Sequence, residues 1–393
     1  MSAARTTTIT REGWIYLLVV AVLFAAAMLR DINLLLVLVG MLAATIVLNG
    51  RGVMVALRGL EVKRKLPERI RAGDLMEIEL EVRHARRWTA SWAVVVEDRI
   101  TRLEGGRATE VITVRVPYGQ IAPRRSVSLS YRGRLARRGK YAIGPLRAAT
   151  RFSFGLLSST RVIEQLDTLV VYPRIGRLRR PWSRLAGMVQ VGSRQSERRQ
   201  GLLEGDFHGL RDWRSGDSRR WIHWRTSARR AALMVRQFER QRNQDLALIL
   251  DLWQPQTPTA EHRSSVELAI SFAATIIADA CRQGSSHLLI AAAAQTPLLT
   301  RGPASMALWE EAMESLAVVE ATSADRLPDV LNQALDAVRP GATTIVIGTR
   351  PLDLTDTSRF AAIWSDPRKR TGLSRIALVN AAEPELDSYF QPE

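Results

Sequence analysis

The chain opens with two almost uninterrupted apolar runs, residues 14–29 and 32–48. Each lies at the short edge of the ~17–25 residues that an apolar helix needs to cross a bilayer. The charged pair Arg30-Asp31 separates the runs, and ionised side chains are costly inside lipid. The pattern therefore predicts a transmembrane helical hairpin, residues 1–58, with the charged pair at its turn.

Basic residues flank both outer ends of this hairpin, and such flanks favour the cytoplasmic side of a membrane. We expect a multi-pass protein of the cell inner (cytoplasmic) membrane, with both termini and the soluble domains in the cytoplasm. Two other interpretations are open: a cleaved signal peptide ending near Ala25-Ala26-Ala27, or two core helices of a soluble domain. The flanking basic residues are Arg5, Arg11, Arg51, Arg58, Lys63, Arg64 and Lys65.

Residues 59–175 change to an alternation of apolar and polar positions. Between Met76 and Val82 every second residue is apolar and glutamates lie between them, and residues 112–116 and 127–131 repeat the pattern. A period of two is typical of half-buried strands. Several short strands without an intervening helix predict an antiparallel β-sandwich of immunoglobulin-like type, which would serve as a spacer or docking surface.

Residues 244–393 alternate apolar strands with helices. Such alternation predicts a parallel sheet covered on both faces, a doubly wound α/β domain. Residues 176–243 form a basic connector before it. The predicted strands are residues 245–253, 286–294, 343–348 and 374–380, and the predicted helices are residues 264–282, 308–319 and 326–338.

The connector contains the densest cluster of arginine, aspartate and tryptophan in the chain. Ser215-Gly216-Asp217 is typical of a turn that precedes a helix, because an aspartate side chain can accept hydrogen bonds from the first amides of that helix. Residues 218–230 are then predicted to be helical, with apolar and aromatic side chains packed and arginines reaching for carboxylates.

This cluster resembles the domain-of-unknown-function 58 family. The resemblance implies a membrane-anchored protein whose C-terminal part is similar to von Willebrand factor A domains. It also implies an association with MoxR-type AAA+ ATPases, and it implies no enzymatic activity. Trp213 is usually a tyrosine in the family. The matching residues are Arg211, Trp213, Gly216, Asp217, Arg220, Ile222, Trp224, Ser227, Ala228, Arg229, Leu233, Val235, Arg236, Phe238, Glu239 and Asp251.

A von Willebrand A domain with a working metal site carries D-x-S-x-S at the end of its first strand, where oxygen ligands hold Mg²⁺. Asp251 stands at the expected position here, but Trp253 and Pro255 replace both serines. The later strand ends in Gly348-Thr349-Arg350 and lacks the usual acidic residue. We therefore expect a degenerate site without metal, in which Asp251 is a structural acid paired with an arginine of the motif.

The net charge of +17 indicates an anionic neighbour. Anionic lipid next to the hairpin explains it with the fewest assumptions, and nucleic acid is the alternative because arginines alternate with tryptophans in the motif. Cys281 is the only cysteine, which excludes a disulfide framework and a multi-cysteine zinc site and fits a reducing compartment. The sequence has no G-x-x-x-x-G-K-[ST] motif, so it is not a P-loop nucleotide hydrolase.

Together these features predict a non-enzymatic, membrane-anchored cytoplasmic scaffold that needs no cofactor. It would bind a protein partner, with a MoxR-type AAA+ ATPase as the candidate. The alternatives are a hydrolase with a site around His208, Asp217 and His223, and a nucleic-acid-binding membrane protein. The expected interaction or structural network either contacts a partner or forms buried ion pairs that brace the domains. It consists of Arg211, Trp213, Asp217, Arg220, Trp224, Arg229, Arg236, Glu239 and Asp251.

Overall fold

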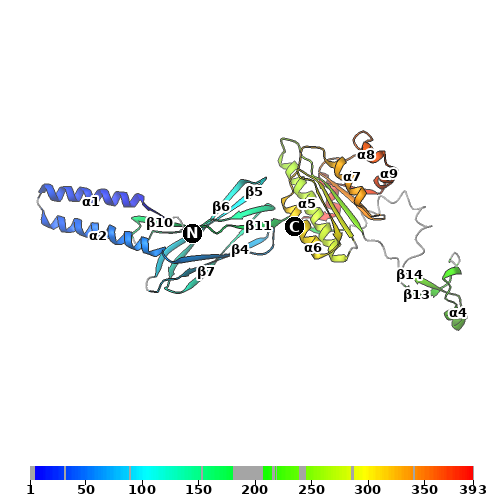
Figure 1. Cartoon of the computed structure of the whole chain (residues 1–393), viewed down its shortest axis with the longest axis horizontal. Helices are drawn as coiled ribbons and strands as arrows, with labels where there is room; N and C mark the ends of the chain where they lie inside the picture. Colours follow the sequence, from blue (N-terminus) through cyan, green and yellow to red (C-terminus); the bar gives the residue numbers. More distant parts are fainter. Residues whose placement is uncertain are drawn as a thin grey trace. The chain divides into compact units, whose positions relative to one another are not determined.

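The computed structural model describes residues 5–30, 32–87, 90–151, 154–179, 207–214, 217, 219–238, 245–284, 287–339 and 341–392. Two compact units divide the chain, Met1–Pro173 and Arg174–Glu393. The first unit holds the N-terminal helices and a β-sandwich, and the second holds the motif and an α/β domain (Figure 1).

Two long apolar helices, α1 (Arg11–Arg30) and α2 (Asn33–Ala56), confirm the predicted apolar pair. Both are long and apolar enough to cross a membrane, and only 11% of each apolar window is buried in the protein. At a rise of ~1.5 Å per residue, α1 is about 30 Å long and α2 about 36 Å. The two helices run side by side (Figure 1). The Tyr16 hydroxyl donates to the Leu42 carbonyl at 3.2 Å. Asp31, which the sequence placed at the turn, lies outside the described residues.

A short strand, β1 (Arg5–Ile9), precedes α1 and was absent from the sequence-based prediction. It pairs antiparallel with β10 (Leu157–Ile163), and β2 (Leu60–Lys65) follows α2. The strands on either side of the helix pair therefore belong to the same folded body. The predicted hairpin is thus fixed to the β-sandwich at both of its outer ends.

The last turn of α2 is held by side chains from this body. The helix leaves its final carbonyl groups without intrahelical partners. Arg5 donates to the Val53 and Met54 carbonyls, at 3.3 and 2.6 Å, and the Ser91 hydroxyl donates to the Ala56 carbonyl. Arg161 donates to the Leu57 carbonyl at 3.4 Å. The positive charges of Arg5 and Arg161 lie near the C-terminus of α2 and therefore also complement its dipole.

Two packed sheets form the β domain, and they confirm the predicted β-sandwich. Their inward residues, such as Ile78, Leu80, Val96 and Ile143, share one buried core. One sheet is ordered β1-β10-β9-β5-β8-β11-β3 with β6 beside β5, and the other is β2-β4-β7. The bounds are β3 (Ile70–Arg71), β4 (Leu75–His84), β5 (Ser91–Glu104), β6 (Arg107–Ile121), β7 (Ser126–Arg134), β8 (Gly139–Ile143), β9 (Leu146–Thr150) and β11 (Asp167–Tyr172).

Arg64 does not flank the membrane as the sequence suggested; its side chain is fully buried between the two sheets. On β2 the inward positions alternate, so Arg64 follows Leu60 and Val62 into the core. Its guanidinium donates to Asp98 at 2.7 Å, and the Tyr131 hydroxyl donates to the other Asp98 oxygen at 2.9 Å. Arg64 also donates to Asp167 at 3.1 Å and to two main-chain carbonyls. Burial and the neighbouring Asp98 carboxylate raise the pKa of Tyr131, so this hydroxyl stays a donor.

We expect Arg64→Leu to destabilise the first unit by about 3–5 kcal/mol, because it leaves the Asp98 carboxylate buried without a counter-charge. Chemical unfolding of the detergent-solubilised protein measures the loss. Lys63→Leu is the matched control, since Lys63 is exposed on the same strand. Adding Asp98→Asn to Arg64→Leu should recover part of the stability, and a variant as stable as the control would contradict this role.

In the second unit a five-stranded sheet has the order β17-β16-β15-β18-β19, and only β17 is antiparallel to its neighbour. Helices α5 and α6 cover one face and α7, α8 and α9 the other (Figure 1). The doubly wound α/β fold is therefore confirmed, while β17 was not predicted. The bounds are β15 (Leu246–Asp251), α5 (Ala260–Gln283), β16 (His287–Ala293), β17 (Leu298–Pro303), α6 (Met306–Val318), α7 (Leu327–Ala337), β18 (Thr343–Gly348), α8 (Ala361–Trp364), α9 (Pro367–Leu373) and β19 (Ile376–Asn380).

Two short elements at the ends of this unit pair with each other. Strand β12 (Arg177–Leu178) lies antiparallel to β20 (Phe390–Gln391), which follows the 3-10 helix η3 (Pro384–Ser388). Phe390 is buried against Phe272 of α5, with ring centroids 5.4 Å apart. Helix α5 is also apolar enough to span a bilayer, but 61% of its apolar window is buried within the protein. This agrees with its prediction as a helix of the α/β domain.

Candidate functional site

The C-terminal sheet places a charged cluster where β15 and β18 end. Asp251 closes β15 and is paired in parallel register with Gly348, the last residue of β18. From β15 the chain continues to β16 on one side, whereas β18 lies on the other side. Open α/β sheets bind ligands in the crevice at such a switch point, outside the carboxyl ends of the strands. This edge of the sheet is therefore the candidate ligand-binding site.

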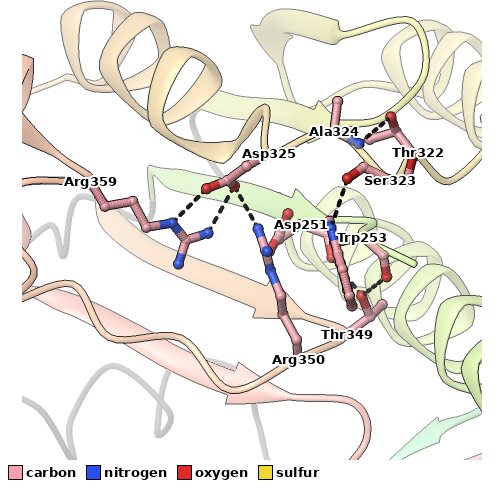
Figure 2. A network of polar contacts seen from close by, with 9 residues as sticks. All are labelled: Asp251, Trp253, Thr322, Ser323, Ala324, Asp325, Thr349, Arg350 and Arg359. Atoms are coloured by element: carbon pink, nitrogen blue, oxygen red, sulfur yellow. Dashed lines mark hydrogen bonds and ion pairs between the residues drawn. The ribbon is translucent and has the colours of Figure 1, made fainter. Parts of the chain in front are cut away.

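Four alternating charges form one network at this edge (Figure 2). Arg350 donates from Nε to Asp251 at 2.9 Å and from a terminal nitrogen to Asp325 at 2.6 Å. Arg359 donates two hydrogen bonds, of 2.7 and 2.9 Å, to the same Asp325 carboxylate. The side chain of Asp251 is 2% exposed and that of Asp325 is 38% exposed. The network thus runs from the buried end of a strand to the surface.

Trp253 and Thr349 fasten the network to the surrounding loops. The Trp253 ring lies 4.9 Å from the Arg350 guanidinium carbon, a cation–π contact, and its indole N–H donates to the Ser323 carbonyl at 3.1 Å. The Thr349 hydroxyl donates to the carbonyls of Asp251 and Trp253, at 3.2 and 2.5 Å (Figure 2). Trp253 therefore packs on an arginine of the network.

The two carboxyl groups of the network differ in their electrostatics. Burial raises the pKa of Asp251 above its usual range, and the Arg350 guanidinium only partly opposes this. The hydrogen bonds from Arg359, and then those from Arg350, lower the pKa of Asp325. Asp325 therefore stabilises the fold above its unfolded pKa of ~4 and loses that contribution on acidification, while Asp251 depends on Arg350 to remain charged.

The partner of Asp251 differs from the prediction, which paired this residue with an arginine of the motif. Arg350 lies after β18, and the parallel register brings it to the strand end that carries Asp251. The Arg350 guanidinium is thus the positive charge beside Asp251. Within the described residues, no group of three or more His, Cys, Asp or Glu side chains is arranged to hold a metal ion.

The motif folds into a hairpin of β13 (Phe207–Asp212) and β14 (Met234–Phe238) that carries a short helix, α4 (Trp224–Arg230) (Figure 1). Arg211 donates two hydrogen bonds of 2.7 Å to Asp217, and the Arg214 amide donates to the same carboxylate at 2.8 Å. These hydrogen bonds, the Arg211 pair first, lower the pKa of Asp217 to about 2.

The predicted helix over residues 218–230 is shorter in the structure, and Asp217 does not cap it. Asp217 is engaged by Arg211 and Arg214, so a 3-10 turn, η2 (Arg219–Trp221), follows it and α4 begins at Trp224. His223 caps α4 instead: its Nδ1 accepts from the Thr226 amide at 3.3 Å and lies 2.8 Å from the Thr226 hydroxyl.

Among the described residues, the structure joins two members of the predicted motif network, Arg211 and Asp217, and this pair is partly exposed rather than buried. Trp213 is half-buried, and its indole N–H has no partner within the part of the chain that the structure describes. Glu239 and the His208 side chain lie outside the described positions. Four further members are exposed: Arg220, Trp224, Arg229 and Arg236.

Of the residues proposed for a hydrolytic site, Asp217 and His223 are described, and they have separate structural tasks. Asp217 holds Arg211, and His223 caps α4. The Ser227 hydroxyl interacts with the His223 carbonyl at 3.1 Å and accepts from the Met234 amide at 2.9 Å, which fastens α4 to β14. Sequence reasoning missed Asp325, Arg350 and Arg359 as a cluster. The parallel order of β15 and β18 was the signal that could have placed Arg350 beside Asp251.

The protein thus combines two apolar N-terminal helices, a β-sandwich and an α/β domain with a charged strand edge. Residues 209–346 match the family model described as "Protein of unknown function DUF58", which confirms the family resemblance seen in the sequence. It is 25% identical over 205 residues to "Uncharacterized protein YeaD" of Bacillus subtilis (strain 168), an alignment that covers 50% of this chain and 48% of that protein. The chain thus spans about half the length of this curated relative.

Similar solved structures include the CARDB domain of PF1109 from Pyrococcus furiosus, which is 18% identical over 27% of this chain and 92% of that chain, with a TM-score of 0.15. Spo0M, a sporulation control protein from Bacillus subtilis, is 12% identical over 40% of this chain and 58% of that chain, with a TM-score of 0.20. Scores this low carry no argument, so the β-sandwich assignment depends on the strand pairing described above.

We expect Arg350→Leu to lower the stability of the α/β domain by about 2–4 kcal/mol, because the buried Asp251 carboxylate loses its counter-charge. The loss should shrink toward acidic pH, where Asp251 is protonated and needs no partner. Urea unfolding at neutral pH and at successively lower pH measures both effects. Adding Asp251→Asn should restore part of the stability, and a loss that stays the same across the whole pH range would contradict the pairing.

Asp217→Asn should destabilise the motif hairpin at neutral pH, because the amide cannot hold Arg211 as an ion pair. The folded pKa of Asp217 lies near 2, below the unfolded value of ~3.9. Its stabilisation is therefore fully present above about pH 4 and is lost as pH falls toward 2. The difference in Tm between wild type and variant, followed from pH 7 to pH 3, should stay constant and then decrease. A difference that is the same at every pH would contradict this assignment.

Proposed function

We propose that this protein is a non-enzymatic, membrane-anchored scaffold whose α/β domain binds a protein partner in the cytoplasm. The observation that carries the proposal is the network at the carboxyl edge of the sheet. At the edge where α/β domains bind ligands, Asp251 is neutralised by Arg350 and the outer carboxylate, Asp325, is held by two arginines. Such an arrangement suits recognition of charged groups better than proton transfer.

The anchor in this proposal is a two-span hairpin. Strand β1 precedes α1 and β2 follows α2, and both strands belong to one sandwich. This supports an even number of crossings, because a single crossing would separate the two strands by a bilayer. The exposed Arg11 and Arg51 near the outer helix ends support a cytoplasmic location for the sandwich.

The chemistry of the partner follows from Arg350 and Arg359. Both guanidinium groups converge on one carboxylate, Asp325, which is the most exposed member of the network. A pair of arginines in this geometry binds any carboxylate well. A glutamate or aspartate of a partner protein would replace Asp325 on these arginines. The resemblance to von Willebrand A domains, which bind a ligand carboxylate at the same strand edge, and the family's association with MoxR-type AAA+ ATPases favour such an ATPase as the partner.

A pull-down of the detergent-solubilised protein from its native membranes, with and without ATP, tests the proposal by mass spectrometry. We expect an AAA+ ATPase to be recovered, less of it with Arg359→Gln, and more of it with Asp325→Ala because both arginines become available. Arg375→Gln is the matched control, since Arg375 is exposed and precedes β19 at the opposite edge of the sheet.

Three results would count against the scaffold interpretation. They are recovery of no ATPase, recovery that is unchanged by Arg359→Gln and Asp325→Ala, and a preparation enriched in nucleic acid. The last result would favour the alternative in which the exposed Arg220, Trp224, Arg229 and Arg236 bind nucleic acid, and it predicts an affinity that falls steeply with salt. Melting curves of each variant exclude unfolding as the cause of lost binding.

A further inference from the structure

The β9–β10 turn, of which the structure describes residues 151 and 154–156, is hydrogen-bonded to the start of α1. Thr10 immediately precedes this helix, and its amide donates to the Leu156 carbonyl at 3.1 Å. The Thr10 hydroxyl also lies 2.7 Å from the Gly155 carbonyl and 2.9 Å from the Leu156 carbonyl, and it accepts from the Gly13 amide at 3.0 Å. The turn and the first helical turn of α1 therefore lie at the same level along the hairpin.

The second helix holds the same turn from the other side. The Asn49 side-chain oxygen accepts from the Leu157 amide at 3.1 Å. On α1, Gly13 allows the close approach, because a Cβ at this position would lie 2.1 Å from the Leu156 carbonyl oxygen. The turn is thus positioned by both helices, and its distance from the bilayer is set by the hairpin rather than by a flexible linker.

A large apolar side chain at this turn faces away from the protein. Phe154 is 63% exposed, as is Trp14 on the first turns of α1. Three exposed arginines, Arg11, Arg51 and Arg151, occur on the helix ends and on the strand side of the turn. Exposed aromatic residues together with arginines are the composition of protein surfaces that enter the headgroup region of a bilayer.

The length of α1 places this turn in the bilayer. Helix α1 has 20 residues, so it is about as long as the ~30 Å hydrocarbon core is thick. Its first residues must then lie at the boundary between headgroups and acyl chains, and the turn hydrogen-bonded to Thr10 lies there too. The sandwich would therefore present Phe154 to lipid.

We propose that the β9–β10 turn is a third membrane contact of this protein: Phe154 inserts into the headgroup–acyl boundary of the cytoplasmic leaflet, and Arg11, Arg51 and Arg151 bind phosphate groups of anionic lipids around it. This inference rests on the membrane anchor of the proposed function. It makes the β-sandwich a peripheral membrane domain with a fixed face toward the bilayer, in addition to its tether.

The test uses the full chain in nanodiscs that contain phosphatidylglycerol and phosphatidylcholine. Cys281 is first replaced by serine, and bimane is then attached in three single variants, Phe154→Cys, Leu166→Cys and Val22→Cys. Leu166 is the matched control, because it is 70% exposed and follows the opposite end of β10. Val22 is 60% exposed in the middle of α1 and reports the anchor itself. Quenching by spin-labelled lipid measures contact with the bilayer.

We expect strong quenching and a blue-shifted emission for the labels at positions 154 and 22, and neither effect at position 166. Quenching at position 22 with none at position 154 would overturn the inference and leave the anchor intact. No quenching at either position would overturn the anchor and the inference together. Equal quenching at positions 154 and 166 would also overturn it, because the sandwich would then lack a defined membrane-facing turn.

Discussion

The first unit depends on how the chain satisfies the carbonyl groups at the end of α2. A helix that leaves an apolar medium exposes its last four carbonyls at the point where water is still scarce. Here Arg5, Ser91 and Arg161, from three different strands, donate to carbonyls between Val53 and Leu57. The sandwich must therefore assemble against the helix end, and the two apolar helices and the β domain form one structural unit.

Arginine has a second task in this protein, which is to neutralise carboxylates buried by the fold. Arg64 does so for Asp98 between the sheets, and Arg350 does so for Asp251 at the strand edge. In each pair the carboxylate is almost completely buried, so its charge is tolerated only because a guanidinium with several donors is fixed beside it. The high arginine content is thus partly an internal structural requirement and only partly a property of the surface.

Periodicity was enough to predict the apolar helix pair, the sandwich and the α/β sheet, because these elements are determined by which side chains they bury. It could not predict β1, whose central Thr6–Thr8 segment has no alternation, or the burial of Arg64, which looked like one more basic residue after a membrane helix. The sequence predicted only part of the charged cluster at the strand edge. Asp251 stood out as a strand-end acid, but Asp325 and Arg359 come from loops whose approach depends on tertiary structure.

The pairing of β1 with β10 has a consequence for how the protein is made. Arg5 is opposite Arg161 in this pairing, so the N-terminal strand emerges from the ribosome more than a hundred residues before its partner. During that interval α1 and α2 are already complete while the N-terminal segment has no partner strand. Closure of β1 onto β10 is therefore a late step of folding, which fixes the start of α1 to the sandwich only after most of the β domain has been made.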